Sequence, residues 1–431
     1  MVLFMRTPKT FFIKTYGCAS NIADSGFVKK LLICSGYKET DLKNANFVLV
    51  NTCTVKGPTV SKIKDYILKL ALKKNKIIIL GCLPCDKIFT KNFYKFSMVN
   101  SYNIDSIVSV CDKILKTNKP VHLLEPKFLD KTNLLCDFKT IAIVQPLIGC
   151  LGKCTFCKTR YAKPLFYSYP LSNIINRIDY YIKSGAKEIW LSSEDNAAYG
   201  KDLALNYMDL LNAIETRFKG KAMFRFGMSN PWLLQKYLLQ LCDFFKKTKA
   251  FYRFLHIPIQ SASNKVLKLM KRSYTEKVVN KIFTDLRNNF SYNELTIATD
   301  TIVGFPNETK KDFNKTKVFS KRYDILINNV SQFWPMSFTE AQKLKQLPTE
   351  IKKERSAILS TIARQESKRV LKTYVAKKVE VYFNDIDGKG NYLGRTRNYI
   401  SVICKSSQKK QRLGEWVLQK IMAVEHYHLL C

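Results

Sequence analysis

The chain has 431 residues, 46% of them hydrophobic, and its 72 lysines and arginines exceed its 34 acidic residues by 38. This composition excludes a disordered protein and allows two to four domains with sizeable cores. Because no apolar segment is long enough to span a bilayer, the positive charge favours nucleic acid over a membrane as partner. Compositional bias of the genome is an alternative source of the lysine excess.

Thirteen cysteines accompany a short apolar start, Met1–Met5, which is too short for a secretory signal. Cysteines in a reducing compartment hold metals more often than they form disulfides. We therefore expect a cytoplasmic protein whose cysteines bind metal.

Residues 9–118 alternate between strand and helix patterns. This alternation predicts an amino-terminal, doubly wound parallel α/β domain. The strands are expected at Thr10–Thr15, Asn46–Asn51 and Ile77–Leu80, and the helices at Ser20–Cys34 and Thr59–Leu72. Residues 118–138, with two prolines among mixed polarity, are interpreted as a linker.

A cysteine follows each of these three strands: Cys18, Cys53 and Cys82. Because the carboxyl ends of parallel strands meet at one edge of a sheet, the three cysteines converge and could hold a cluster. The alternative is three ordinary core cysteines. Cys85 forms a C-x-x-C pattern with Cys82, but Cys82 has the same offset from its strand as the other two, so we favour it as the ligand.

A second set of cysteines, Cys150, Cys154 and Cys157, follows the apolar strand Ile141–Val144 with the spacing C-x3-C-x2-C. Structural zinc needs four ligands, and no fourth cysteine or histidine lies nearby in sequence, whereas an iron–sulfur cluster held by three thiolates keeps one iron open. The alternatives are a zinc knuckle completed from a distance and three buried thiols. The motif, with aromatic Phe156, resembles the signature of radical S-adenosylmethionine (SAM) enzymes.

That resemblance implies a [4Fe-4S] cluster on these three catalytic cysteines, with SAM bound to the open iron. Together with Thr15–Cys18, Asn51–Cys53 and Gly81-Cys82, the motif resembles the methylthiotransferase family. The family resemblance implies a second [4Fe-4S] cluster on Cys18, Cys53 and Cys82, which carries or surrenders the inserted sulfur. It also implies tRNA as partner, a flavodoxin- or ferredoxin-like electron donor and a sulfur donor.

Residues 139–372 again alternate between strands and helices, which matches the partial (βα)6 barrel that the resemblance implies. Active residues should lie at the carboxyl ends of the strands. The six strands are expected at Ile141–Gln145, Glu188–Leu191, Met223–Gly227, Tyr252–Ile257, Leu295–Val303 and Ile325–Phe333.

Several residues at these ends are candidate contacts for SAM. Glu194 is placed like the acidic residue that pairs with the SAM amino group in the resembled enzymes. Arg272 suits SAM or a phosphate, with a solvated basic face as the alternative. His256 is interpreted as a structural residue. The full set of cofactor-binding candidates is Phe156, Glu194, Ser229, Gln260, Arg272 and Gly304.

The segments Glu188–Asp195, Phe254–Ser261 and Met270–Arg272 resemble the archaeal and eukaryotic branch of the family, which methylthiolates carbon 2 of N6-threonylcarbamoyladenosine beside the tRNA anticodon. This chain departs from the family at Asn196–Gly200, Ser261–Asn264 and Met336–Thr339, where a usual Arg-Pro-Gly-Thr is missing. The alternatives are the same chemistry on isopentenyladenosine or on a ribosomal-protein aspartate, and a non-catalytic RNA-binding iron–sulfur protein.

Residues 373–431 change to a period of two, which predicts a small carboxyl-terminal β-barrel that resembles a TRAM domain, an RNA-binding module. Its strands are expected at Val379–Phe383, Tyr392–Thr396, Tyr399–Cys404, Trp416–Lys420 and Met422–Glu425. We expect basic and aromatic side chains there to contact RNA: Tyr392, Arg395, Arg397, Tyr399, Lys405, Lys409, Lys410, Arg412 and Trp416.

Overall fold

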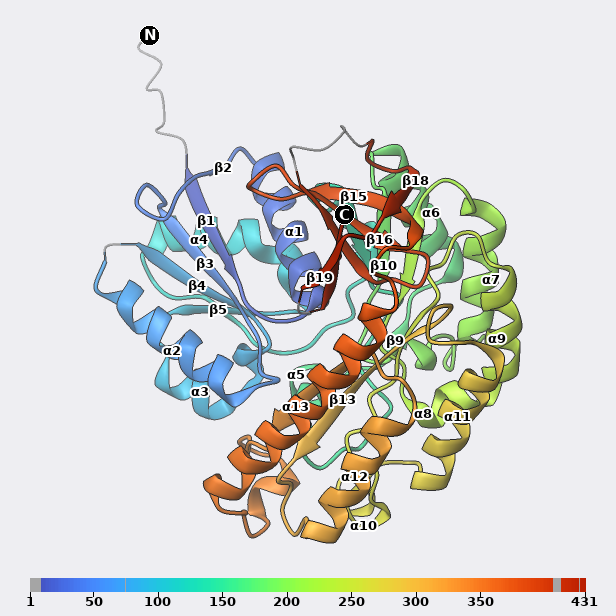
Figure 1. Ribbon diagram of the computed structural model, residues 1–431. Helices are drawn as coiled ribbons and strands as arrows, with labels where there is room; N and C mark the ends of the chain where they lie inside the picture. The colour runs from blue at the N-terminus through green and yellow to red at the C-terminus, as the bar shows by residue number, and fades with distance from the viewer. Residues whose placement is uncertain (1–8, 74, 406–411, 426) are drawn as a thin grey trace.

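Three groups of strands organise the chain, as the computed structural model shows for residues 9–73, 75–405, 412–425 and 427–431 (Figure 1). A parallel sheet comes first, a set of six parallel strands surrounded by helices follows, and a mostly antiparallel sheet ends the chain. Among the described residues, no helix is both long and apolar enough to cross a membrane.

The first sheet is parallel throughout, in the order β2-β1-β3-β4-β5-β6. Apolar residues of α1 and α4 pack on one face, and those of α2 and α3 pack on the other, which confirms the doubly wound arrangement (Figure 1). Its elements are β1 Thr10–Thr15, α1 Ala19–Cys34, β2 Lys38–Glu39, β3 Phe47–Thr52, α2 Gly57–Ala71, β4 Lys76–Gly81, α3 Lys87–Asn92, β5 Ser97–Asn100, α4 Ile107–Thr117 and β6 His122–Leu123.

Residues 118–138, interpreted from the sequence as a linker, also pack against the first sheet. Its β6 pairs in parallel with β5 at the edge of the first sheet. Lys131 forms a 2.6 Å ion pair with Asp24 of α1, and both side chains are almost fully buried. This pair fastens the segment to the amino-terminal part of the chain.

The central strands form two parallel sets, β7-β10-β11 and β12-β13-β14, which an isolated parallel bridge between Phe224 and Phe251 joins. The six predicted strands are therefore confirmed, in sequential order. They are β7 Ile141–Val144, β10 Glu188–Leu191, β11 Met223–Phe226, β12 Phe254–His256, β13 Thr296–Val303 and β14 Ile327–Gln332. The accompanying helices are α6 Leu171–Lys183, α7 Tyr207–Phe218, α8 Pro231–Leu234, α9 Leu238–Lys247, α10 Asn264–Leu269, α11 Glu276–Asn289, α12 Lys310–Arg322 and α13 Thr349–Lys372.

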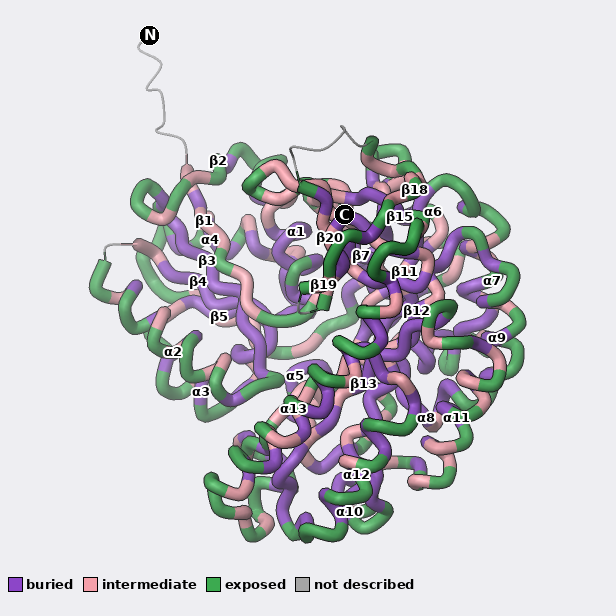
Figure 2. Tube along the Cα trace, viewed as in Figure 1, coloured by how far each residue is buried: buried purple, intermediate pink, exposed green. Residues whose placement is uncertain are grey.

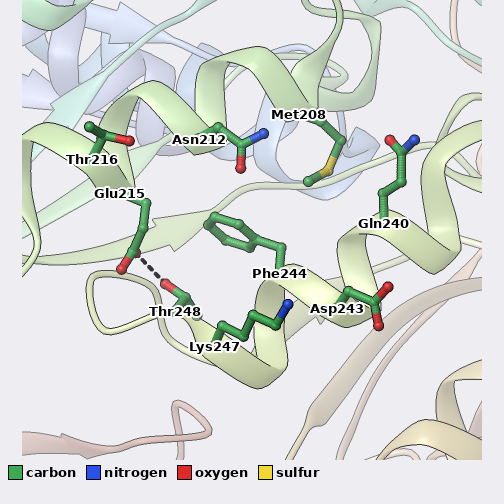
Figure 3. Close-up of a pocket in the computed structure, with 9 residues that line it drawn as sticks. All are labelled: Met208, Asn212, Glu215, Thr216, Gln240, Asp243, Phe244, Lys247 and Thr248. Carbon is green, nitrogen blue, oxygen red and sulfur yellow. Dashed lines mark hydrogen bonds between the residues drawn. The ribbon is translucent and has the colours of Figure 1, made fainter.

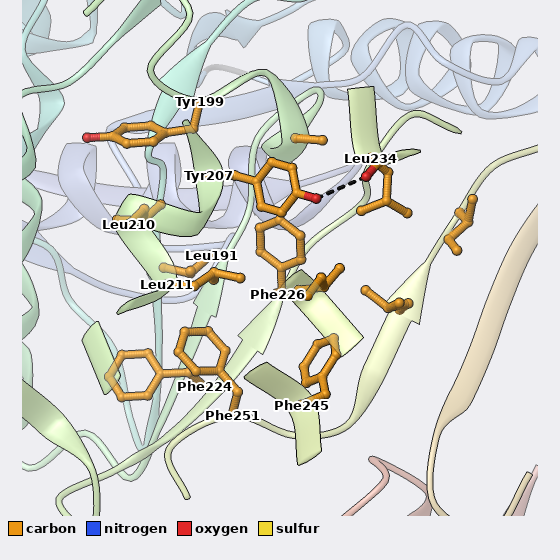
Figure 4. Close-up of a cluster of buried hydrophobic side chains, with 14 of the residues drawn as sticks. Leu191, Tyr199, Tyr207, Leu210, Leu211, Phe224, Phe226, Leu234, Phe245 and Phe251 are labelled. Carbon is orange, nitrogen blue, oxygen red and sulfur yellow. Dashed lines mark hydrogen bonds between the residues drawn. The ribbon is translucent and has the colours of Figure 1, made fainter. Parts of the chain in front are cut away.

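Alternate residues of these strands face in opposite directions, as the period of a strand requires. Outward residues such as Leu191, Phe224 and Phe226 pack against α7 and α9 in a dry aromatic core (Figure 4). Inward residues such as Trp190 and Arg225 line the barrel interior and are less buried. Figure 2 shows the buried trace concentrated along the strands, with the exposed trace on the surrounding helices and loops.

The carboxyl-terminal sheet has six strands rather than the expected five, in the order β18-β15-β16-β17-β20-β19, and curls into a half-barrel. The additional β20 was missed because its residues, His428, Leu429 and Leu430, do not alternate between polar and apolar. The strands are β15 Lys378–Ile386, β16 Tyr392–Thr396, β17 Ser401–Cys404, β18 Trp416–Lys420, β19 Ala423–Glu425 and β20 His428–Leu430. Cys404 and Cys431 form a disulfide, which corrects the expectation of metal binding rather than disulfides. The parallel pairing of β17 and β20 brings the two cysteines together.

Candidate functional site

The three cysteines of the first sheet lie together at its carboxyl edge. Cys18, Cys53 and Cys82 follow β1, β3 and β4, which are neighbours in the sheet. Burial raises the pKa of Cys82 well above its usual range, and the adjacent Cys53 and Cys18 add to the rise. Because thiols influence one another in this way only at short range, the structure brings the three predicted sulfurs into one site.

A tight turn and two buried amides hold this first site. Gly17 has a φ of +115°, and a Cβ there would lie 2.8 Å from the Cβ of Cys53, so only glycine lets the turn approach so closely. Asn21 donates from Nδ2 to Asn51 Oδ1 at 3.0 Å, and Asn51 donates from Nδ2 to the Asn21 carbonyl at 2.8 Å. This exchange ties the start of α1, which follows Cys18, to the end of β3.

The second set of cysteines lies on a loop that is closed at its base by the antiparallel pair β8 (Leu147–Ile148) and β9 (Tyr167–Ser168). The Gly152 N–H donates to Cys150 Sγ at 3.3 Å. A Cβ on Gly152 would lie 3.3 Å from Cys150 Sγ and 3.6 Å from Cys154 Sγ, so both sulfurs turn toward the same side of the backbone. Burial raises the pKa of Cys150 to about 12, with contributions from Asp195, Cys157 and Cys154.

Each set supplies three cysteine thiols, which are the ligands that an iron–sulfur cluster takes. Among the described residues, no three histidine, cysteine, aspartate or glutamate side chains are grouped closely enough for one metal ion. The thiolates around a [4Fe-4S] cluster bind different irons and therefore stand farther apart. Gly152 places no side chain beside the two sulfurs, and metal coordination would deprotonate the thiols.

Arg272 is fixed directly beside the loop cysteines. Its Nη1 donates to Cys154 Sγ at 3.1 Å, and its Nη2 donates to the Pro258 carbonyl at 3.0 Å and to Asn230 Oδ1 at 3.2 Å. Its Nε donates to the Tyr274 hydroxyl at 2.7 Å. The alternative of a solvated basic face is therefore wrong, because every nitrogen of the guanidinium is engaged inside the protein.

Lys163 and Glu194 form a buried ion pair between the two cysteine sets, with side chains 4% and 9% exposed. Glu194 also accepts a hydrogen bond from the Gly149 N–H at 3.0 Å, next to Cys150. Burial alone lowers the pKa of Lys163, but the Glu194 carboxylate, with Asp24, Cys82 and Cys18, more than offsets this and raises the pKa well above its usual range. Lys163 thus stands close to the first set while its partner contacts the loop of the second.

The carboxylate of Asp195, next to Glu194, has a hydrogen-bond partner for only one of its two oxygens. Its Oδ1 accepts from the Asn230 N–H at 3.0 Å, whereas its buried Oδ2 has no hydrogen-bond partner. Burial raises its pKa to about 6. The sequence pointed to Glu194 and gave no sign of Asp195 or Lys163. Only the fold shows that Glu194 is paired with Lys163, whereas one oxygen of Asp195 has no hydrogen-bond partner.

Of the other predicted cofactor residues, Ser229, Gln260 and Gly304 follow barrel strands, and Phe156 lies on the cysteine loop. Ser229 is fully buried and donates to the Gly227 carbonyl at 3.2 Å. The Gly304 N–H donates to Glu308 Oε2 at 2.8 Å. Gln260 follows β12 with a φ of +63°, and Phe156 packs edge-to-face on Phe305.

His256 lies near an acid that sequence reasoning did not single out. Its Nε2 stands 3.1 Å from Asp300 Oδ2 of the neighbouring strand β13. Asn329 of β14 donates to the other oxygen of Asp300 at 2.8 Å. By hydrogen-bond geometry, however, the buried Nε2 has no partner, so the structural role of His256 stays a prediction.

The expected RNA surface of the carboxyl-terminal sheet needs correction. Tyr399 is 9% exposed and packs on Tyr252 and Phe254 of the barrel, so its ring is not available to a base. Arg397 stacks on Trp416 with 4.2 Å between guanidinium and ring centroid. An alternating sequence pattern cannot show which face of a sheet packs against the barrel.

Of the other predicted RNA contacts, Lys405 and Arg412 are exposed, Tyr392 and Arg395 are half-buried, and Lys409 and Lys410 lie outside the described residues.

A surface pocket of about 660 Å³ lies apart from both cysteine sets, between α7 and α9 on the outside of the barrel (Figure 3). Glu215 accepts there from the Thr248 hydroxyl at 2.5 Å. Its lining contains no cysteine, and we assign it no part in the site.

Comparison with known proteins connects these observations. Residues 10–96 match the family described as "Uncharacterized protein family UPF0004", and residues 144–319 match the radical SAM superfamily. The "Probable threonylcarbamoyladenosine tRNA methylthiotransferase" of Pyrococcus horikoshii is 36% identical over 406 residues, which cover 92% of this chain and 94% of that protein. The chain belongs to the radical SAM methylthiotransferase family.

Membership extends to its archaeal and eukaryotic threonylcarbamoyladenosine tRNA branch. The human threonylcarbamoyladenosine tRNA methylthiotransferase is 32% identical over 402 residues, with 91% of this chain and 69% of the human protein covered. The solved radical SAM methyltransferase TsrM from Kitasatospora setae superposes with a TM-score of 0.55 over 78% of this chain and 74% of that chain. At 10% identity, this likeness shows the fold alone.

Proposed function

We propose that this chain is a tRNA methylthiotransferase that attaches a methylthio group to carbon 2 of N6-threonylcarbamoyladenosine next to the anticodon. The observation that carries the proposal is the placement of two three-cysteine sets on either side of the Lys163–Glu194 pair. The relatives named for this reaction match nearly the whole chain. The positive charge of 38 suits an RNA substrate.

We assign one [4Fe-4S] cluster, with SAM at its open iron, to Cys150, Cys154 and Cys157. A second [4Fe-4S] cluster is assigned to Cys18, Cys53 and Cys82. When bound, the first supplies the electron for reductive cleavage of SAM, and the second supplies the chemistry of sulfur insertion. Both assignments rest on the convergence of the thiols described above; Cys18 is exposed, and the other five are partly or fully buried.

The residues of the chain around these positions have separable tasks. Arg272 places a fixed positive charge against Cys154, which stabilises a thiolate there. Lys163 neutralises Glu194 and keeps its carboxylate on the Gly149 N–H, so the loop holds one shape. The unpartnered Oδ2 of Asp195 is the acceptor left for the amino group of SAM. We retain Phe156, Glu194, Ser229, Gln260, Arg272 and Gly304 as cofactor contacts in this proposal.

The same proposal covers the organisation of the chain and its partners. We divide it into a domain for the second cluster at 9–118, a radical SAM domain at 139–372 and a TRAM-like RNA-binding domain at 373–431. In the last domain, exposed Lys405 and Arg412 remain available to phosphates. A flavodoxin- or ferredoxin-like electron donor, a sulfur donor and a cytoplasmic location complete the proposal.

Anaerobic reconstitution tests the proposal against a non-catalytic RNA-binding protein. We expect about eight irons per chain and the release of deoxyadenosine when SAM and a reductant are added. With an anticodon hairpin that carries threonylcarbamoyladenosine, we expect a product heavier by one methylthio group. Bound iron without cleavage of SAM would favour the binding protein, and a product formed only from an isopentenyladenosine hairpin would favour the sibling reaction.

A further inference from the structure

Arg225 lies on the inward side of β11, in the middle of the barrel. It is paired in register with Trp190 of β10, and Gly227 follows it on the same face. The guanidinium lies 5.1 Å from the Trp190 ring, 5.3 Å from the Phe254 ring and 5.6 Å from the Tyr399 ring. Three aromatic rings therefore surround a cation that remains partly accessible from the barrel interior.

This guanidinium has no anionic partner among the described residues. It appears in no ion pair, and its buried Nε has no hydrogen-bond partner. The inward carboxylate on the neighbouring strand, Glu188, is already bonded to Trp190 Nε1, to the Tyr252 hydroxyl at 3.0 Å and to Asn384. An unpaired charge in an apolar enclosure is costly, so the site is built to receive an anion.

The charge balance at this depth of the barrel strengthens the case. Arg395 reaches the same Tyr399 ring from the carboxyl-terminal sheet, with its guanidinium 4.7 Å from the centroid. Burial lowers the pKa of Arg395, but Tyr399 and then the Glu188 carboxylate more than offset this effect and raise it. Two guanidiniums therefore meet at the Tyr399 ring.

The enclosure can be reached from one end. At the amino ends of the strands, the carboxyl-terminal sheet closes the barrel: Tyr399 packs on Phe254, Trp416 packs on Tyr252, and Tyr382 donates to the Lys187 carbonyl at 2.9 Å. In Figure 1, β15 and β16 accordingly lie beside β10. The amino ends are thus covered, which leaves the carboxyl ends, where both cysteine sets lie, as the approach that we assign to an anion.

We infer that Arg225 is the receptor for a carboxylate inside the barrel, carried there by the threonylcarbamoyl group of the substrate nucleoside. This inference rests on the proposed function and deepens it: an isopentenyl group has no charge for Arg225 to bind, whereas the threonyl group ends in a carboxylate. A bidentate guanidinium–carboxylate pair between aromatic walls would orient the base as well as select it. The other source of the same chemistry is the carboxylate of SAM.

The test compares three anticodon hairpins by fluorescence anisotropy with the full chain: one with threonylcarbamoyladenosine, one with its carboxyl converted to an amide, and one with plain adenosine. We expect the first to bind roughly 10- to 100-fold more tightly than the amide, as for a charge-assisted hydrogen bond in an enclosed site. Arg225→Gln should abolish this preference and leave the plain hairpin unchanged, and Arg225→Lys should retain part of it.

Arg364→Gln, at an exposed position of α13, is the matched control and should keep the full preference. SAM affinity of the reconstituted protein is measured in parallel. If Arg225→Gln lowers SAM affinity and keeps the hairpin preference, the bound carboxylate is that of SAM and the substrate assignment is overturned. If it changes neither, Arg225 is no carboxylate receptor. A wild-type protein that methylthiolates the hairpin without a binding preference contradicts the inference but not the proposed function.

Discussion

The two cysteine sets are assembled in opposite ways. The loop set comes from eight consecutive residues, Cys150 to Cys157, on a segment closed by a two-residue strand pair. The sheet set takes one cysteine from the end of each of three strands, and Cys18 and Cys82 are 64 positions apart in the sequence. The loop set thus depends on local backbone shape, and the sheet set depends on the complete amino-terminal fold.

The two sets should therefore be sensitive to substitutions in different parts of the chain. A change in the core of the first sheet displaces cysteines that have no local connection to one another. The loop set is instead supported by the barrel through Arg272 and through Glu194. The Lys163–Glu194 pair is one buried contact through which the two sites share a support, and the buried Lys158–Asp86 pair is another.

The largest effect should come from removing one cysteine of each set. We expect Cys150→Ala to abolish the release of deoxyadenosine, because SAM loses its metal. We expect Cys53→Ala to leave that release intact, to lower iron from about eight to about four per chain, and to abolish methylthiolation. Iron analysis and chromatography of the nucleosides measure both.

Cys34→Ala is the matched control, because Cys34 is exposed at the end of α1 and belongs to neither set. It should keep the iron content and both activities. Equal iron loss in the Cys53 and Cys34 variants would contradict the assignment of the sheet set.

The next largest effect should come from the support between the two sites. Lys163→Met leaves Glu194 buried and unpaired, which should lower the free energy of unfolding by about 3–5 kcal/mol. The double variant Lys163→Met/Glu194→Gln should recover most of this loss, since neither charge remains. Urea unfolding of the cluster-free protein measures both, and additive losses in the double variant would show that the pair is not coupled.

A pH effect of up to about 3 kcal/mol is expected from Asp195, whose pKa is about 6 in the folded protein instead of 3.8. The folded state keeps its proton where the unfolded state has lost it, so stability is full below pH 4 and declines as the pH rises to 6. Asp195→Asn should remove this part of the slope. The difference in unfolding free energy between the two proteins, measured at pH 4, 5, 6 and 7, tests it, and a constant difference would contradict it.

The smallest effect should be confined to the sheet set. Asn51→Ala removes the hydrogen bonds that Asn51 makes with the Asn21 amide, the Asn21 carbonyl and the Ser25 hydroxyl, at a cost of about 1–3 kcal/mol. Because Asn51 supports Cys18 and Cys53 and has no bond to the loop, iron at the sheet set should become more easily chelated while deoxyadenosine release is kept. Loss of both together would mean that the two sites are not independent.

Much of the fold follows from local pattern. The buried runs Phe47–Thr52 and Lys76–Gly81 are apolar enough to identify as strands, and parallel pairing then brings their following cysteines together. The C-x3-C-x2-C spacing identifies the loop set without any structure. These features are visible because short-range periodicity determines them.

Other features depend on contacts between distant elements and leave no local pattern. Lys163 reads as one lysine among many in a basic chain, yet it is buried by the meeting of two domains. Tyr399 has the composition of an RNA contact, but the sheet turns it toward the barrel. Arg225 lies in a strand with no unusual sequence pattern. Only the structure shows that none of the described residues near it supplies an anionic partner.

The most direct test of the central claim is the nucleoside profile of tRNA from cells that lack this gene. We predict that methylthiolated threonylcarbamoyladenosine disappears and its unmethylthiolated precursor accumulates. The wild-type gene should restore the modification, and the Cys53→Ala variant should not. Intact methylthiolated nucleoside in the deleted cells would contradict the account.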